Sequence, residues 1–121
     1  MADFTEKQIQ LVWEKGKAVK NYDKDKYRQD PCGAWIVRDK YGSQGSHGWQ
    51  IDHAYPSSKG GDEDIRNLRP MHWKNNQSKG DDYPNYTYKV KAEGKKNVEI
   101  EASIVVHDDL QKTLKTLYKI K

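Results

Sequence analysis

Short apolar patterns alternate with polar stretches along this chain, and the first pattern has helical spacing. Residues 5–20 place Ile9, Val12 and Trp13 on one face, and Thr5 stands where a helix cap is expected. We therefore predict an amphipathic helix in this region.

The central part of the chain changes from strand-like to loop-like patterns. Residues 21–30 are polar and predict a loop, whereas 34–40 and 48–53 are rich in apolar residues and predict two strands paired with each other. Residues 55–68, broken by proline and a glycine pair, predict a long ordered loop. Residues 70–79 predict a short helix with a proline in its first turn.

The last third of the chain has its own pattern. Residues 86–92 and 98–106 alternate apolar and polar positions, which predicts two strands joined by a turn. A helix is expected to follow, capped by Asp108 or Asp109. We expect this tail to extend the core sheet, although an exposed strand could also mediate dimerisation.

Composition limits the core and the compartment. The 121 residues are 34% hydrophobic and 33% charged, which leaves a small core, and four Trp and eight Tyr argue against disorder. No membrane span and no secretory signal is recognisable, so we expect a cytoplasmic protein encoded by a bacterium or phage. The predicted class is α+β, with a core over 1–84 and an extension over 85–121.

Charge gives weak support for a polyanionic partner. The formal net charge is +4, and residues 85–121 hold 8 lysines and 5 acidic residues, so most of the excess lies in the tail. Cys32 is the single cysteine and is expected to be buried; neither an internal disulfide nor a four-cysteine zinc site can be built from it.

The strongest chemical signal is the order of polar residues between positions 49 and 82. Asp52 and His53 end an apolar run, Asn67 follows fourteen residues after His53, and Asn76 nine residues later. Carboxylate and amide oxygens suit a hard divalent cation, and an imidazole with a pKa near 6.5 can accept a proton.

This ordered set resembles the HNH endonucleases of the ββα-metal superfamily. The resemblance rests on Asp52-His53, Gly60-Gly61, Asn67-Leu68 and the Asn76 to Gly80 segment. It implies a β-hairpin, a long loop and a short helix. The N-terminal helix and the C-terminal strand-strand-helix extension are expected from the sequence pattern alone. The cysteine pairs that hold a structural zinc in many relatives are missing, and His72 and Asn75 stand at one such pair.

The resemblance also implies roles for the four residues. His53 would be the general base, Asp52 and Asn76 would bind one Mg²⁺ or Mn²⁺, and Asn67 would brace the loop and orient His53, for example by accepting a hydrogen bond from its ring. Helical phase separates Asn76 from Asn75 by about 100°.

Other residues have weaker support. Lys79, Arg38 and Arg69 are candidates for contacts with nucleic acid, and His72 is a candidate for the second shell of the site, although a packed histidine is preferred.

We therefore expect an enzyme, a metal-dependent endonuclease that nicks double-stranded DNA with low sequence specificity, as a monomer or weak dimer. Two other functions fit the same residues. One is a non-catalytic nucleic-acid-binding module, and the other is a toxin or effector nuclease neutralised by a partner protein.

Overall fold

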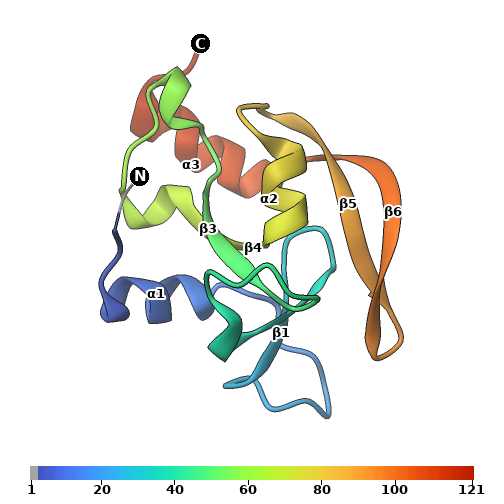
Figure 1. Ribbon diagram of the computed structural model, residues 1–121. Coiled ribbons are helices and arrows are strands. Elements are labelled where there is room, and N and C mark those ends of the chain that lie inside the picture. Colours follow the sequence, from blue (N-terminus) through green and yellow to red (C-terminus); the bar gives the residue numbers. More distant parts are fainter. Residues whose placement is uncertain (1–2) are drawn as a thin grey trace.

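The computed structural model describes residues 3–121 and combines short helices with small antiparallel sheets. The α+β class expected from the sequence is confirmed. None of the helices in that range is long and apolar enough to cross a lipid bilayer. Along the chain, the elements of regular structure are α1 (Glu6–Trp13), β1 (Tyr27–Gln29), β2 (Trp35–Val37), β3 (Trp49–His53), β4 (Leu68–His72), α2 (Trp73–Lys79), β5 (Asn85–Glu93), β6 (Lys96–Val105) and α3 (Asp108–Tyr118) (Figure 1).

The first helix forms where the sequence predicts it but ends earlier. The Thr5 hydroxyl accepts from the Gln8 amide, and Gln8 bonds back to the Thr5 amide, so both orphan donors of the first turn are used. After Trp13 the chain turns, and Lys17 exchanges two backbone hydrogen bonds with Gln29. Pairing with β1 therefore replaces the second half of the expected helix.

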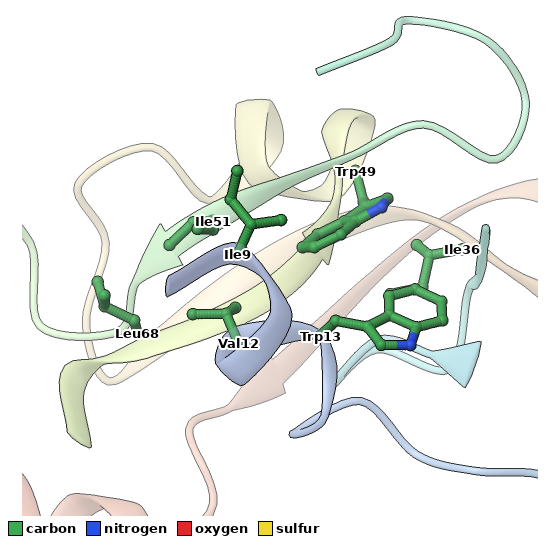
Figure 2. Packing of buried hydrophobic residues seen from close by; sticks show 7 residues of the cluster. All are labelled: Ile9, Val12, Trp13, Ile36, Trp49, Ile51 and Leu68. Carbon is green, nitrogen blue, oxygen red and sulfur yellow. The ribbon is translucent and has the colours of Figure 1, made fainter. Parts of the chain in front are cut away.

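The apolar face of α1 packs on the ribbon made by β3 and β4. Its buried residues meet side chains from three strands, and the Trp13 and Trp49 ring centroids lie 5.4 Å apart. Burying each large side chain contributes roughly 1.5–3 kcal/mol. Figure 2 shows the cluster, which comprises Ile9, Val12, Trp13, Ile36, Trp49, Ile51 and Leu68.

The strand pairing expected around the long loop is wrong. β3 pairs with β4, whereas β2 pairs with β1. The pairing of β1 with β2 is local because a tight turn over Asp30–Gly33 joins them, with Gly33 at a φ of +86°. β1 lies in the segment for which the sequence predicts a loop.

The expected helix start at residue 70 is also wrong, because Pro70 lies in the middle of β4 opposite Ile51. A two-stranded ribbon leaves one edge of each strand without ladder partners, where the missing N–H of proline is tolerated. The order is therefore strand, long connection, strand, helix, and α2 begins only at Trp73.

The tail forms two strands and a helix, as expected, but it does not extend the core sheet. β5 and β6 pair with each other in a separate antiparallel sheet, and β5 packs against α2 (Figure 1). The alternate positions of β6 are half-buried and exposed in turn, as the sequence pattern predicts. The cap of α3 is His107, whose Nδ1 accepts from the Asp109 amide, rather than either aspartate.

A buried carboxylate, Asp30, joins three parts of the chain. One of its oxygens accepts from the amides of Cys32 and Ala34, and the other accepts from the His72 amide and from Asn75 Nδ2. Burial raises the pKa of Asp30, and the four donors lower it in part. This cluster includes His72 and Asn75, so hydrogen bonds hold the start of α2.

Replacing Asp30 by asparagine should lower the free energy of unfolding by about 2–4 kcal/mol. The amide nitrogen must then face two donors, which leaves buried groups unsatisfied at about 1–3 kcal/mol each. Urea titration followed by tryptophan fluorescence would measure this, with the exposed Asp25→Asn variant as the control. Equal midpoints for the two variants would contradict the role of Asp30.

Candidate active site

Three of the four residues that carry the sequence signal meet at one small cavity. Asp52 and His53 lie at the end of β3, and Asn76 lies on the facing side of α2. The cavity is about 110 Å³, and the residues that line it are Ile51, Asp52, His53, Pro56, Ser57, Asn76, Gly80 and Asp81. The β3–β4–α2 arrangement thus brings the acid, the base and the amide together.

The Asp52 carboxylate is buried between two cations. Its Oδ2 accepts from Arg69 Nε at 2.8 Å, and its Oδ1 lies 3.4 Å from Lys79 Nζ. The side chains of Asp52, Arg69 and Lys79 are 3%, 8% and 0% exposed, respectively. Arg69 is the cross-strand partner of Asp52, and Lys79 comes from the last turn of α2. One carboxylate therefore links all three elements of the site.

This cluster holds more positive than negative charge. Burial and the neighbouring Arg69 lower the pKa of Lys79, and Asp52 opposes that shift. Lys79 Nζ also donates to the His53 carbonyl oxygen at 3.2 Å, and the Tyr86 ring lies beneath both cations. Within the described residues, Arg69 Nη2 is buried without a hydrogen-bond partner.

Lys79 and Arg69, the candidates for contacts with nucleic acid, have other partners in the structure. Both side chains are buried against Asp52, so neither can reach a phosphate in this structure. Arg38 is bound to α1 instead, through Glu6 at 2.6 Å and Gln10 at 2.9 Å.

His53 is the accessible member of the site. Its side chain is 24% exposed, and His53 lines the same cavity as Asp52 at the end of β3. The Phe4 ring centroid lies 6.4 Å from the His53 ring, and His53 Nε2 lies 3.1 Å from Glu63 Oε1. Sequence reasoning missed Glu63, because a contact across a long loop leaves no periodic signal.

Asn67 closes the loop rather than touching His53. Its Oδ1 accepts from the Tyr55 amide at 2.7 Å, and its Nδ2 donates to the carbonyl oxygens of Tyr55 and Asp62. The direct bond from Asn67 to the imidazole, considered from the sequence, is therefore replaced by bracing of the loop backbone. A Cβ at Gly61 would lie 1.8 Å from the Tyr55 oxygen, so the loop needs glycine there.

The neighbouring asparagines of α2 face different surroundings, as helical phase predicts. Asn75 is buried: its Nδ2 donates to Asp30 and Val90, and its Oδ1 accepts from two backbone amides of β5. Asn76 lines the cavity, and its Nδ2 donates to Gln50 Oε1 at 2.8 Å. This bond fixes the orientation in which the amide oxygen of Asn76 is left for another ligand. Gln50 could have been found from its spacing of two from Asp52 along β3.

His72 is a packed residue outside the cavity. Its Nδ1 accepts from the Lys74 amide as the cap of α2, and its Nε2 donates to the Ser46 carbonyl oxygen. Burial lowers the pKa of His72, so its neutral form suits both bonds. A place in the second shell of the site is therefore not supported by its contacts, and the packed alternative describes it.

The oxygen donors match a hard divalent cation in kind. Asp52 supplies a carboxylate and Asn76 an amide oxygen, and Mg²⁺ typically takes one or two protein carboxylates and completes its shell with water or phosphate. No group of three or more His, Cys, Asp or Glu side chains that could hold a metal occurs within residues 3–121. Cys32 is buried, and burial raises the pKa of its thiol to about 12.

Asp52→Ala should lower the free energy of unfolding by about 3–5 kcal/mol, because it leaves two buried cations without their counter-ion. The free energy of unfolding of Lys79→Met should stay within about 1 kcal/mol of the wild-type value. This substitution removes the excess positive charge and nearly conserves the side-chain volume. Urea unfolding would compare them, with Glu101→Ala on the surface as the control. If Lys79→Met destabilised the protein as much as Asp52→Ala, the inference that the excess positive charge of Lys79 does not stabilise the fold would be wrong.

Comparison with known proteins supports the sequence signal. Residues 43–85 match the family model described as HNH endonuclease, a range that contains β3, β4, α2 and the cavity. No curated protein and no solved structure gives a significant match. Residues 43–85 are therefore similar to the HNH endonucleases, and this similarity suggests nuclease activity on a nucleic acid.

Proposed function

We propose that this chain is a divalent-metal-dependent DNA endonuclease that hydrolyses one strand of a duplex. The observation that carries the proposal is that Asp52, His53 and Asn76 line one cavity within the matched segment. His53 is the partly exposed imidazole there, and in this proposal it is the general base.

In this proposal, each residue of the site has its own role in the reaction. His53 takes a proton from a water molecule, and the resulting hydroxide attacks phosphorus as the bond to the 3′ oxygen breaks. A divalent ion held by Asp52 and Asn76 would neutralise phosphate charge and stabilise the leaving oxygen. The expected products carry a 5′ phosphate and a 3′ hydroxyl.

The charge around Asp52 should make metal binding weak. The carboxylate already neutralises Arg69 and faces Lys79, so a divalent ion would share it with two cations. Repulsion between like charges in a buried site opposes binding. We therefore propose that the divalent ion binds together with a phosphate of the substrate. The negative charge of the phosphate would offset the excess positive charge around Asp52.

Supercoiled plasmid should be nicked in the presence of Mg²⁺ or Mn²⁺, and a chelator should abolish the nicking. His53→Ala should lower the rate by about 10²–10⁴-fold, the usual contribution of a general base. His47→Ala, whose ring bonds to the Ser46 hydroxyl, is the matched control. Binding of DNA without any nicking would favour a non-catalytic module instead.

The two adjacent asparagines offer a second test. Asn76→Ala should weaken Mn²⁺ binding, measured by calorimetric titration in the presence of a non-cleavable duplex, and leave stability nearly unchanged. Asn75→Ala should lower the free energy of unfolding by about 2–4 kcal/mol, because it leaves buried backbone groups unsatisfied. Equal Mn²⁺ affinity in the wild type and Asn76→Ala would reject Asn76 as a ligand.

A further inference from the structure

We propose that Glu63 is a positioning residue for His53: it accepts the hydrogen on Nε2 and thereby leaves Nδ1 as the nitrogen that takes the proton from water. This inference rests on the proposed function, because it assigns the partner that prepares the base. Neither the sequence motif nor the family match identifies Glu63.

The contact itself sets the direction of the hydrogen bond. His53 Nε2 and Glu63 Oε1 are 3.1 Å apart, within hydrogen-bond distance. An ionised carboxylate can only accept, so a neutral imidazole must carry its hydrogen on Nε2 to make this bond. Nδ1 then holds the free lone pair, and no donor among residues 3–121 occupies it.

The position of Glu63 is set by hydrogen bonds of the adjacent residues, Asp62 and Asp64, because its own side chain is not buried. Its side chain is 47% exposed, but Asp62 before it is fixed by the C-terminal helix. The Asp62 amide donates to the Tyr118 hydroxyl at 3.1 Å, and that hydroxyl donates to Asp62 Oδ1 at 2.6 Å. On the other side, the Asp64 amide donates to Asp62, and Arg66 bonds to the Asp64 carboxylate.

The Tyr118 ring, whose hydroxyl bonds Asp62, is itself packed against another aromatic ring. The Tyr118 ring stacks on the Tyr55 ring with centroids 5.2 Å apart, and Tyr55 is the residue that Asn67 bonds at its backbone. Burial, together with the hydrogen bond to Asp62, raises the pKa of Tyr118 to about 12, so the phenol keeps its proton. Both ends of the loop segment that presents Glu63 are therefore tied down.

The pair also suits the chemical step. When Nδ1 takes a proton from water, the ring becomes a cation, and the hydroxide that remains attacks phosphorus. The carboxylate of Glu63 then lies against the positive ring and stabilises it, while its hydrogen bond keeps the ring in place. The proton ends on His53, and the electron pair of the broken P–O bond leaves with the 3′ oxygen.

The experiment compares Glu63→Ala, Glu63→Gln and the surface control Glu93→Ala. We expect Glu63→Ala to lower kcat by about tenfold to a hundredfold with KM nearly unchanged. Glu63→Gln should recover part of that loss, because its amide oxygen can accept the same hydrogen. A rise in KM without a fall in kcat would overturn the proposal.

A spectroscopic readout tests the same idea without turnover. In ¹⁵N NMR spectra recorded where the imidazole is neutral, wild-type His53 should carry its hydrogen on Nε2, and Glu63→Ala should show a mixture of tautomers. An unchanged tautomer in Glu63→Ala, or a hydrogen on Nδ1 in the wild type, would overturn the role of Glu63. A wild type with no nicking activity would refute the proposed function. The tautomer measurement would still show whether Glu63 accepts the hydrogen from His53 Nε2.

Tyr118→Phe serves as a second variant. It removes the hydroxyl that holds Asp62 and keeps the ring that stacks on Tyr55. We expect a smaller fall in kcat in the same direction as Glu63→Ala, with a melting temperature close to the wild type. A Tyr118→Phe variant with wild-type kcat would overturn the claim that the C-terminal helix fixes the position of Glu63.

Discussion

The arrangement of β3, β4 and α2 depends on the buried carboxylate of Asp52. It receives Arg69 from the paired strand and faces Lys79 from the helix, so one charge ties β3, β4 and α2 together. Desolvating such a cluster costs several kcal/mol per ion, and the gain depends on good geometry. The chain has a single cysteine, and polar contacts such as this one and the Asp30 cluster join its elements.

This use of Asp52 changes how its role must be tested. The same side chain is proposed to bind a metal and is observed to balance two buried cations, so its removal would affect folding and metal binding together. Asn76 does not have this double role, because its side-chain hydrogen bond within the described residues is to the uncharged Gln50. A substitution of Asn76 therefore tests the proposed metal site with less effect on folding than a substitution of Asp52.

Short-range spacing in the sequence predicts the parts of the site that depend on a single element. The adjacent Asp52 and His53 both line the cavity at the end of one strand, and helical phase separates Asn76 from the buried Asn75. Spacing fails where pairing depends on distant residues: it puts Pro70 in a helix and pairs β2 with β3. The Asp30 cluster and Glu63 join residues 10 to 45 positions apart, and no local pattern records such contacts.

The C-terminal extension contributes to the site through geometry more directly than through its lysines. Tyr118 near its end bonds the residue next to Glu63, and β5 supplies the amides that satisfy Asn75 in α2. Removing residues 85–121 would therefore uncover α2 and release the loop in addition to removing positive charge. Weaker DNA binding after such a deletion would not identify an interaction with phosphate.

A charge change that keeps Tyr118 in place separates the two contributions. Lys112, Lys115 and Lys121 lie together along α3 and the chain end, and glutamine at these positions would remove positive charge without removing the helix. If the tail binds phosphate, the dependence of DNA affinity on salt concentration should then become shallower. The slope should fall by up to about 0.9 for each phosphate that is no longer neutralised, because fewer counterions are released on binding. An unchanged slope would show that Lys112, Lys115 and Lys121 do not neutralise phosphate, and the structural contribution of the extension through Tyr118 and the amides of β5 would remain.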